Sequence, residues 1–414
     1  MKLNSKQPFK AKDKNMESAY GNNIIQSMLD TDYYTFTMMQ AVLHQHPGEE
    51  VEYQFIVRSK ESLVEDIPEI RKQMEVLCNL EMREDELRFL GDPVKRGYLK
   101  PDFIRFLSLY RFNLRYVHVF EQDGNVAIRV RGPWLHTIMF EQPILSMISE
   151  IRNRRVYPDV TLEAVREKLY AKFDSLHACA TKEELSYLRV ADFSTRRRLS
   201  FEAQREMVQI MKADFPGVFT GTSNVHLGHE YDLPVIGTMA HQWLMAYQQF
   251  GRLRESQSAA LEGWVKEYRG DLGVALTDCI SSDFFLSEFD SYFTKLFDGL
   301  RHDSGNPFEW GEKVIAHYKK MGIDPASKSV VFSDSLNFDT CLELIRVFKG
   351  RLRMSFGIGT NLGCDVEGVT PLSIVMKLVE VNGDPVVKFS DDPVKVVCNS
   401  PSFLEYAKNV FKIA

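Results

Sequence analysis

The chain has 414 residues, enough for two or three domains or for one large barrel with an additional domain. Hydrophobic residues make up 44% of the sequence and charged residues 26%, the ordinary balance of a globular protein, and no apolar run approaches the ~18 residues that span a membrane. The formal net charge of −6 gives no general attraction to nucleic acid or to an anionic membrane, so any anionic ligand has to be bound by local clusters of arginine.

The chain begins with a lysine-rich segment, residues 1–20, that has no apolar stretch behind its lysines. This segment predicts a flexible, solvated tail and not a signal peptide. The six cysteines are scattered and include no CxxC pair, which favours free thiols in a cytoplasmic protein over a zinc site.

Residues 21–140 predict an α+β domain with an antiparallel sheet. Apolar residues recur at helical spacing in some stretches and alternate with polar residues in others, and an Asp-Gly pair separates two of the alternating stretches, as in a hairpin. The expected helices span residues 32–46 and 66–80, and the expected strands span residues 50–58, 116–120 and 126–130.

From residue 141 the pattern changes to helices that alternate with short apolar strands, as in βα units around a parallel sheet. The expected helices span residues 143–155, 161–180 and 200–215, and the expected strands span residues 188–191, 218–220, 235–237, 274–276, 329–332 and 354–357. Almost every strand ends in polar residues or glycine, which favours a closed α/β barrel over residues 141–385 with its site at the carboxyl ends of the strands. A doubly wound open sheet is the alternative, and residues 386–414 are candidates to complete the first domain.

The stretch 220–243 predicts the centre of a ligand site. Two Gly-Thr turns, at Gly221 and Gly237, each follow an apolar run, which is typical of a buried strand whose end leaves backbone N–H groups free to face a ligand. His241 stands at the start of an expected helix over 241–250, where the helix N-terminus favours a bound phosphate. A core histidine beside two ordinary turns is the alternative interpretation.

Two motifs place arginines at strand ends. In DFSTRRR, Phe193 is suited to stack on a flat ring and Arg196 to bind phosphate with two hydrogen bonds, although adjacent arginines also occur on solvated helix faces. In RHDSGNP, Arg301 and Asp303 suit a metal-bound phosphosugar, because the arginine binds anionic oxygens while the carboxylate holds Mg²⁺ or ribose hydroxyls. An Asp-capped turn with a local salt bridge is the simpler alternative for this motif.

A glycine-rich loop, SFGIGTN, closes a later strand and contains Gly357, Gly359 and Thr360, which could wrap a phosphate with backbone N–H groups. The strand-end pairs that contain Asp278 and Asp334 are weaker signals, since such residues often cap helices. The sequence has no Walker A, dinucleotide-binding, HExxH or GxSxG motif.

Taken together, the motifs LDTDYYTFTM, ADFSTRRR, GTSN, PVIGTMAH, RHDSG and SFGIGTN resemble those of the nicotinate phosphoribosyltransferase family, from about residue 30 to the C-terminus. The resemblance implies the irregular α/β barrel of type II phosphoribosyltransferases, with an additional α+β domain. It also implies an ATP-dependent enzyme of NAD salvage that joins nicotinate to phosphoribosyl pyrophosphate, with Mg²⁺ as cofactor, and releases nicotinate mononucleotide and pyrophosphate.

The resemblance also implies roles for individual residues. His241 would be the phosphohistidine formed with ATP, with Asp303 and Arg301 beside it in catalysis and Asp303 and Asp278 as metal ligands. Nicotinate would contact Tyr34, Phe193, Thr222, Ser223 and Arg301. The phosphoribosyl group would contact Arg196, Ser333, Asp334, Gly357, Gly359 and Thr360. In related enzymes the tyrosine comes from a neighbouring subunit, which implies a homodimer with Tyr34 crossing the interface.

The residue after the Gly221-Thr222 turn bears on whether the substrate is the acid, nicotinate, or the amide, nicotinamide. The similar nicotinamide-specific enzyme has an aspartate there, whereas Ser223 is neutral and can donate a hydrogen bond to a carboxylate, so we expect nicotinate as substrate. Ser194 and Gln242 depart from residues that are common in the family, without removing a reacting group. The alternatives are a nicotinamide-specific transferase, a non-catalytic nicotinate- or phosphosugar-binding protein, and a generic barrel hydrolase or aldolase.

Overall fold

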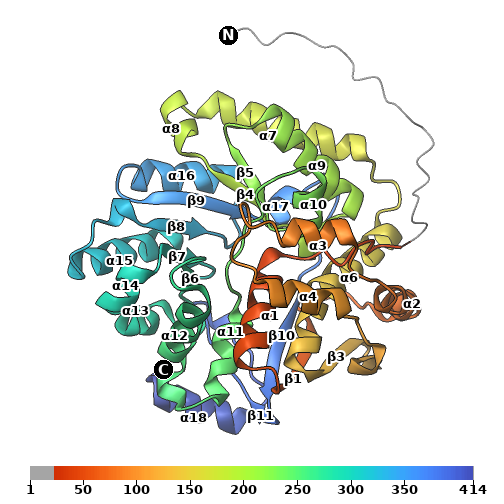
Figure 1. Cartoon of the computed structure of the whole chain (residues 1–414). Coiled ribbons are helices and arrows are strands. Elements are labelled where there is room, and N and C mark those ends of the chain that lie inside the picture. Colours follow the sequence, from red (N-terminus) through yellow and green to blue (C-terminus); the bar gives the residue numbers. More distant parts are fainter. Residues whose placement is uncertain (1–22, 414) are drawn as a thin grey trace.

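The computed structural model describes residues 23–413, so the tail expected over residues 1–20 lies outside the described residues (Figure 1). Two β-sheets organise this part of the chain. One has five antiparallel strands in the order β11-β10-β1-β3-β2, and the other has six parallel strands in the order β5-β4-β9-β8-β7-β6. No described helix is long and apolar enough to cross a bilayer.

The antiparallel sheet is built from both ends of the chain. Its strands are β1 (Glu50–Val57), β2 (Val117–Gln122), β3 (Asn125–Pro133), β10 (Ile374–Val381) and β11 (Asp384–Pro385). The expected strand and hairpin of the first domain are present, and β10 pairs along the whole of β1. The segment that returns to this sheet is therefore 374–385, which precedes the segment 386–414 named from the sequence.

The helices of the N-terminal part surround this sheet. They are α1 (Tyr33–Gln45), α2 (Ile67–Cys78), α3 (Glu84–Leu90), α4 (Pro101–Leu109), α5 (Trp134–Thr137) and α6 (Glu141–Val156). Helix α1 is buried on nearly every side because it lies between α5 on the sheet side and α12 (Ser256–Tyr268) on the barrel side. This position brings the start of α1 to the mouth of the barrel.

The parallel sheet consists of short strands, β4 (Val190–Asp192), β5 (Phe219–Thr222), β6 (Val274–Leu276), β7 (Gly299–His302), β8 (Ser329–Phe332) and β9 (Arg353–Ile358). Five of these match expected strands. Strand β7 was not expected, because the segment GLRH has one large apolar residue, Leu300, and gives no strand pattern of its own.

The stretch 235–237, expected as a strand, forms a single parallel bridge between Val235 and Thr222. Pro234 has no N–H to donate to a ladder, which limits pairing here. The stretch nevertheless joins the two edge strands: the Ile236 N–H donates to the carbonyl of Thr222 in β5, and the Thr238 hydroxyl donates to the carbonyl of Val274 in β6. The sheet thus closes through an irregular segment, and the predicted fold class, an irregular α/β barrel with an additional α+β domain, is confirmed.

Helices cover the outside of the barrel, with α12 to α16 alongside β6 to β9 in Figure 1. They are α7 (Leu162–Cys179), α8 (Lys182–Tyr187), α9 (Phe201–Asp214), α10 (Val225–Glu230), α11 (His241–Ala246), α13 (Ser282–Glu288), α14 (Ser291–Leu296), α15 (Pro307–Lys320), α16 (Phe338–Phe348), α17 (Thr360–Gly363) and α18 (Pro401–Phe411). The helix expected over 241–250 ends its α-helical part at Ala246 and continues as a 3₁₀ turn. The C-terminal helix α18 buries Phe411 against Phe284 of the barrel, so it does not join the antiparallel sheet.

Candidate active site

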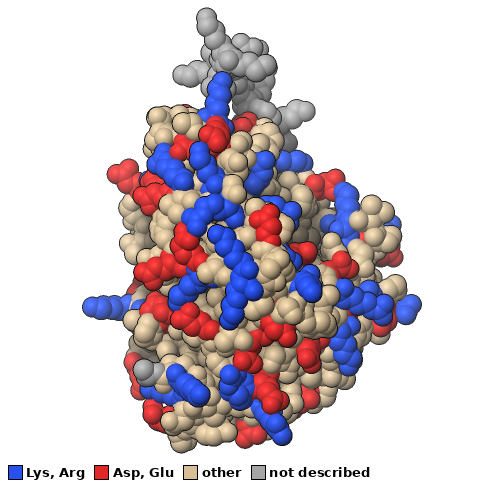
Figure 2. Space-filling view, turned by 90° about the vertical axis from the view of Figure 1, so that its left-hand side faces the viewer, with Lys and Arg blue, Asp and Glu red and all other residues tan. Residues whose placement is uncertain are grey.

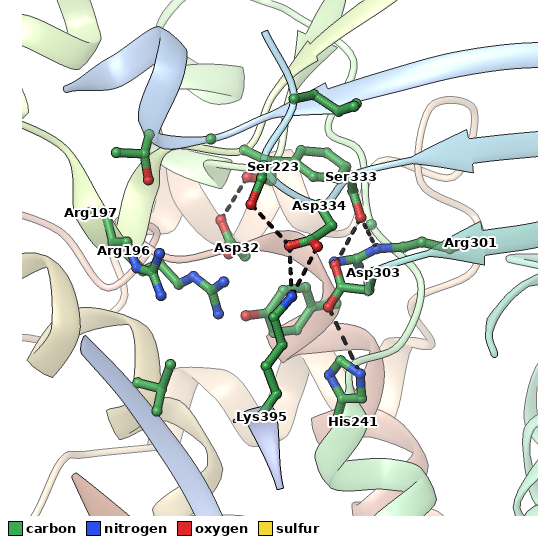
Figure 3. A pocket seen from close by; sticks show the side chains of 18 of the residues that line it. Asp32, Arg196, Arg197, Ser223, His241, Arg301, Asp303, Ser333, Asp334 and Lys395 are labelled. Carbon is green, nitrogen blue, oxygen red and sulfur yellow. Dashed lines mark hydrogen bonds and ion pairs between the residues drawn. The ribbon is translucent and has the colours of Figure 1, made fainter. Parts of the chain in front are cut away.

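A cavity of about 510 Å³ lies at the carboxyl ends of the parallel strands, where the start of α1 and strand β10 also reach (Figure 3). Most of the residues singled out from the sequence line it, although they are scattered over some 330 positions of the chain. Those that line the cavity are Tyr34, Phe193, Arg196, Ser223, His241, Arg301, Asp303, Ser333, Asp334, Gly359 and Thr360. Thr222, Asp278 and Gly357 lie behind its wall.

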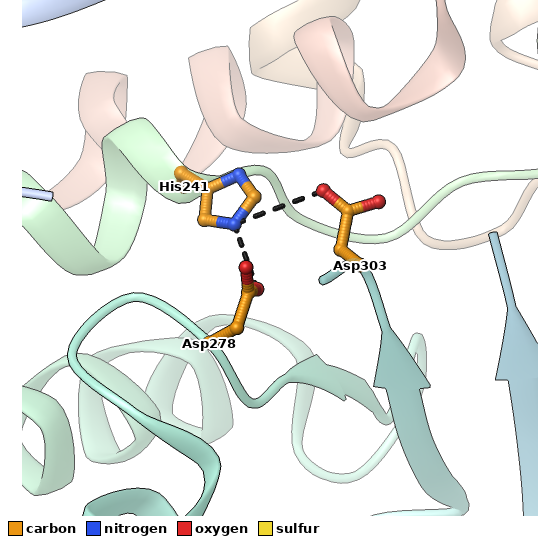
Figure 4. Close-up of side chains that lie close together, drawn as sticks. All are labelled: His241, Asp278 and Asp303. Atoms are coloured by element: carbon orange, nitrogen blue, oxygen red, sulfur yellow. Dashed lines mark hydrogen bonds and ion pairs between the residues drawn. The ribbon is translucent and has the colours of Figure 1, made fainter. Parts of the chain in front are cut away.

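His241, the first residue of α11, lies between two carboxylates (Figure 4). Its Nε2 is 2.9 Å from Asp278 Oδ1 and 3.8 Å from Asp303 Oδ2. Burial lowers the pKa of His241 to about 4, although Asp278 acts in the opposite direction, so the ring is neutral at neutral pH. The contact with Asp278 assigns the proton to Nε2, which leaves the lone pair on Nδ1. Nδ1 has no hydrogen-bond partner among the described residues.

Asp278 is held behind His241 by three donors. Besides His241, the Ser304 hydroxyl and the Lys388 ammonium each donate to its Oδ2 at 2.7 Å. Burial raises the pKa of Asp278, but the contacts with His241 and Lys388 outweigh burial and hold the pKa well below its usual range. Asp278 is therefore an ionised carboxylate that fixes the orientation of the imidazole ring.

The three residues His241, Asp278 and Asp303 bring ligand atoms within 4.8 Å of one another. Their suitability for a divalent cation differs. Both oxygens of Asp278 already accept hydrogen bonds, one of them from a lysine, so this residue fits a metal poorly. Asp303 is one-fifth exposed and faces the cavity, and oxygen ligands are those that Mg²⁺ prefers. Of the two expected metal ligands, Asp303 fits the geometry.

Arg301, at the end of β7, is held rigidly by its neighbours. Its Nε donates to Ser333 Oγ at 2.8 Å and its terminal nitrogen donates to Asp303 Oδ1 at 2.9 Å. The Ser333 hydroxyl donates to the same Asp303 oxygen. The guanidinium carbon lies 5.6 Å from the centre of the Phe193 ring. An anionic group on a ring stacked against Phe193 would therefore lie beside a fixed cation.

The three adjacent arginines of DFSTRRR have three different environments. Arg196 lines the cavity and forms no hydrogen bond or ion pair with any residue that the structure describes. Arg197 also lines the cavity, where burial and the neighbouring Arg196 lower its pKa to about 9. Arg198 is fully buried and pairs with Asp30 outside the cavity. None of the three lies on a solvated helix face, and Arg196 is the arginine of this motif that is left free to bind an anion in the cavity.

Further cations reach the cavity from parts of the sequence that the motifs do not cover. Altogether seven arginines and lysines line it, against three aspartates. The cations from outside the motifs are Arg58, Lys377, Lys388 and Lys395, and the other three are Arg196, Arg197 and Arg301. Burial and the neighbouring Lys388 lower the pKa of Lys377 to about 8. A lysine within the largely apolar segment IVMKLVEV was the available signal for Lys377. Nothing in the local sequence marks Lys395, which pairs with Asp334 at 2.9 Å.

The excess of cations over carboxylates in the cavity differs from the surface of the molecule that one view shows. On the face of the molecule shown in Figure 2, basic and acidic side chains are interspersed. The expectation that an anionic ligand is bound by local cations therefore agrees with the structure, and the ligand suggested by seven cations is one with several negative charges.

Tyr34 and Phe193 supply the aromatic side chains of the cavity. Tyr34 comes from α1 of the same chain, and the Gln142 amide donates to its hydroxyl. The cavity of one chain thus contains both aromatic residues, and the homodimer with Tyr34 crossing its interface stays a prediction. Gly357, expected in a phosphate loop, instead lies behind Phe193, since a Cβ at this position would overlap the ring.

At the end of β5, neither Thr222 nor Ser223 points its hydroxyl hydrogen toward the cavity as expected. Thr222 is buried and donates to Asp192 at 2.8 Å, away from the cavity. Ser223 does line the cavity, but its hydroxyl donates to Asp32 Oδ1 at 2.7 Å. Ser223 was expected to donate to the carboxylate of the substrate, whereas in the structure its hydroxyl donates to Asp32, a carboxyl group that the LDTD motif supplies from a distant part of the chain.

The two residues that depart from the family pattern are both well accommodated. Ser194 is buried, donates to Asp192 at 2.5 Å and fills the space over Gly363 in α17. The amide of Gln242 donates to Glu141 at 3.0 Å, which a glutamate at this position could not do when ionised.

Comparison with known proteins gives consistent results along the whole described chain. Residues 29–149 match the nicotinate phosphoribosyltransferase N-terminal domain, and residues 188–414 match the nicotinate phosphoribosyltransferase family. Nicotinate phosphoribosyltransferase 1 of Pseudomonas aeruginosa is 57% identical over 398 residues, which cover 96% of this chain and 99% of that protein. Nicotinate phosphoribosyltransferase of Ectopseudomonas mendocina is 56% identical, with the same coverage.

Solved structures agree with the sequence matches. The crystal structure of nicotinate phosphoribosyltransferase from Vibrio cholerae superposes with a TM-score of 0.92 at 38% identity, and the similarity covers 95% of each chain. The enzyme from Porphyromonas gingivalis superposes with a TM-score of 0.88 at 34% identity, covering 94% of this chain and 100% of that one.

Proposed function

The chain belongs to the nicotinate phosphoribosyltransferase family, and we propose that it transfers phosphoribosyl from phosphoribosyl pyrophosphate to nicotinate, coupled to ATP hydrolysis through a phosphohistidine at His241. The observation that supports the coupling most directly is the hydrogen bonding of the His241 ring. Its Nε2 is occupied by Asp278, and its Nδ1 is unpartnered beside a cavity rich in cations.

Nicotinate binds between the aromatic residues of the cavity. The ring stacks on Phe193 and Tyr34, and Arg301 supplies the positive charge for the substrate carboxylate. The pyridine nitrogen is itself a nucleophile and needs no general base. It displaces pyrophosphate from C1 of ribose through a transition state with oxocarbenium character, so the protein's contribution is to orient the ring and to supply fixed charges.

The phosphates of phosphoribosyl pyrophosphate bind among the arginines and lysines of the cavity. Arg196 is the cation best placed for this, because it has no protein partner to give up. Gly359 and Thr360, at the start of α17, line the same cavity and suit the 5′-phosphate. Asp303 would hold the Mg²⁺ that accompanies the pyrophosphate, and the metal would supply positive charge beside the leaving group.

ATP phosphorylates His241. The lone pair on Nδ1 forms the N–P bond with the γ-phosphorus while the bond to ADP breaks, and Asp278 stabilises the positive charge that develops on the ring. Asp278 can do so because Lys388 and Ser304 keep it ionised and in place.

The proposed function is tested by mass detection of nicotinate mononucleotide. Purified protein is incubated with nicotinate, phosphoribosyl pyrophosphate and Mg²⁺, with and without ATP, and nicotinamide replaces nicotinate in a parallel reaction. We expect nicotinate mononucleotide, formed faster with ATP and together with ADP, and loss of the product when EDTA removes Mg²⁺. Formation of the nicotinamide product in preference, or of no mononucleotide, would contradict the proposal.

Gly357→Ala tests the stacking of nicotinate on Phe193. The new Cβ would overlap the Phe193 ring and displace it, so the loss of one stacking contact, worth ~1 kcal/mol, should raise KM for nicotinate about fivefold while KM for ATP stays unchanged. Gly217→Ala is the matched control, because no atom lies within 4 Å of a Cβ built there. An unchanged KM for nicotinate in a stable Gly357→Ala protein would refute the role given to Phe193.

A further inference from the structure

We propose that Asp32 determines the specificity for the acid: its carboxyl group keeps its proton and donates it in a hydrogen bond to the carboxylate of nicotinate. The inference rests on the proposed function and deepens it. The sequence motifs gave Asp32 no role beyond the start of a helix. The structure places its carboxyl group in the wall of the cavity, next to the residue that was expected to choose between acid and amide.

Asp32 is held in place by its backbone and by Ser223. It precedes α1 at the position where an aspartate usually caps a helix, yet its side chain makes no cap hydrogen bond. The carboxyl group turns instead to Ser223, whose hydroxyl donates to Oδ1 at 2.7 Å. The N–H of Tyr33 donates to the Ser223 carbonyl at 2.8 Å, so the two segments are also fixed to each other through the backbone.

No lysine, arginine or histidine within the described residues forms an ion pair with Asp32, which is only 7% exposed. Asp30, two residues earlier, shows the contrast. There, burial raises the pKa but the paired Arg198 outweighs it, so the pKa of Asp30 is lowered. At Asp32, burial raises the pKa, and the hydrogen bonds and the more distant Arg196 offset it only in part.

The groups that face Asp32 come from every element around it. Arg196 supplies positive charge, whereas the nearby carboxyl groups oppose ionisation of Asp32. The facing groups are Ser223 after β5, Thr195 and Arg196 after β4, Asp192 in β4, Tyr34 in α1 and Glu141 in α6. A carboxyl group in this setting favours its neutral form.

The protonation state of Asp32 decides which substrate it accepts. A protonated carboxyl group donates one O–H, which suits a carboxylate, whereas an ionised one can only accept and would suit the N–H groups of an amide. The Ser223 hydroxyl already donates its hydrogen bond to Asp32, so the donor that this part of the cavity wall offers to the substrate is the Asp32 O–H. A hydrogen bond from it to the nicotinate anion is charge-assisted, and the proton stays shared with Asp32 without net transfer.

Asp32→Asn tests the proposal, because asparagine keeps the shape and an N–H donor but cannot ionise. In the wild type, kcat/KM for nicotinate should fall as the pH rises and Asp32 loses its proton, by about tenfold per pH unit above its pKa. Lys377 and Arg197 also titrate in the alkaline range, so the decisive quantity is the ratio of wild type to variant at each pH. We expect Asp32→Asn to use nicotinate, and we expect its kcat/KM to lack the fall with rising pH that ionisation of Asp32 causes in the wild type.

Three further measurements extend the test, and two of them measure nicotinate binding without turnover. Nicotinate binding, measured by calorimetry in buffers of different ionisation enthalpy, should take up a proton at alkaline pH in the wild type and not in Asp32→Asn. Ser223→Ala removes a hydrogen bond that lowers the pKa of Asp32, so the decline in nicotinate use should begin at a higher pH in this variant. Asp32→Leu, which has no donor, should weaken nicotinate binding where Asp32→Asn does not.

The outcomes separate this inference from the proposed function. If the wild type makes no nicotinate mononucleotide, the function itself is wrong. If it does, but Asp32→Asn has the same pH profile and the same proton uptake as the wild type, only the role of Asp32 is wrong. Tighter nicotinate binding by Asp32→Asn at every pH would show that Asp32 is ionised in the working enzyme, and would equally overturn the inference.

Discussion

His241→Ala is expected to abolish phosphorylation of the protein by ATP and the ATP hydrolysis that depends on it. His241 is the histidine whose Nδ1 lies free at the cavity, and no other histidine lines that cavity among the described residues. Incubation with γ-³²P-labelled ATP should therefore leave the variant without acid-labile label. Transfer of phosphoribosyl without ATP should persist weakly, since the pyridine nitrogen attacks C1 unaided.

His229→Ala is the matched control for this experiment. His229 lies on α10, where it is partly exposed next to Asp85 and away from the cavity, so labelling of this variant should equal that of the wild type. Melting curves of both variants report whether the substitution disturbs the fold. Label that survives in His241→Ala, at the level found in His229→Ala, would rule out His241 as the phosphorylated residue.

The pH dependence of labelling gives a second check on the same site. A histidine with its ordinary pKa near 6.5 would lose reactivity as the pH falls from about 8 to about 6, because protonation removes the nucleophilic lone pair. Burial lowers the pKa of His241 to about 4, so the neutral ring persists over that whole range. The initial rate of phosphorylation should therefore be nearly constant from about pH 8 to about pH 6.

The sequence allowed the site to be predicted where one motif places its chemistry at the end of one strand. Phe193 and Ser333 directly follow apolar segments that form β4 and β8, and parallel strands bring their carboxyl ends to one edge of the barrel, so these residues had to meet. His241 could be placed for a related reason, because it begins a helix immediately after the irregular segment that closes the barrel.

The remainder of the site depends on contacts between distant segments, which local patterns do not report. Lys377 and Lys395 reach the cavity from the returning end of the chain, and Asp32 reaches Ser223 across 191 positions. Strand β7 gave no signal because its partners, and not its own apolar residues, hold it in the sheet. Gly357 was assigned to phosphate binding from its loop motif, yet glycine is needed there because a Cβ would overlap the Phe193 ring.

The run of three arginines shows the same limit, because adjacent residues of one motif lie in different environments. Arg198 is fully buried and donates to both oxygens of Asp30, at 2.7 and 2.8 Å. Its Nε lies 3.6 Å from a carboxyl oxygen of Glu150, which is also buried. Arg198→Met keeps much of the apolar stem but leaves the buried carboxyl group of Asp30 without its cation, whereas Glu150 keeps its ion pair with Arg154. Because breaking a buried ion pair by removing one partner costs ~3–5 kcal/mol, we expect a loss of folding stability of that order.

Urea unfolding of Arg198→Met and Arg196→Met compares two substitutions of the same chemistry two positions apart. Arg196 has no partner in the described chain, so Arg196→Met should change stability by no more than ~0.5 kcal/mol while it weakens the binding of phosphoribosyl pyrophosphate. Equal stability of the two variants would refute the structural role of Arg198.

The pH dependence of the Arg198→Met defect identifies its cause. In the wild type, the pairing lowers the pKa of Asp30 below that of the unfolded chain, so it stabilises the fold above the unfolded value near 3.8 and the stabilisation disappears as the pH falls through the lowered pKa. In Arg198→Met, burial without the cation raises the pKa of Asp30, and the cost of the buried charge is present only while the unfolded carboxyl group is ionised. The stability difference between variant and wild type should therefore be largest near neutral pH and shrink as the pH falls toward 4. A difference that stays constant with pH would show that lost packing around Arg198, and not the uncompensated charge of Asp30, is responsible.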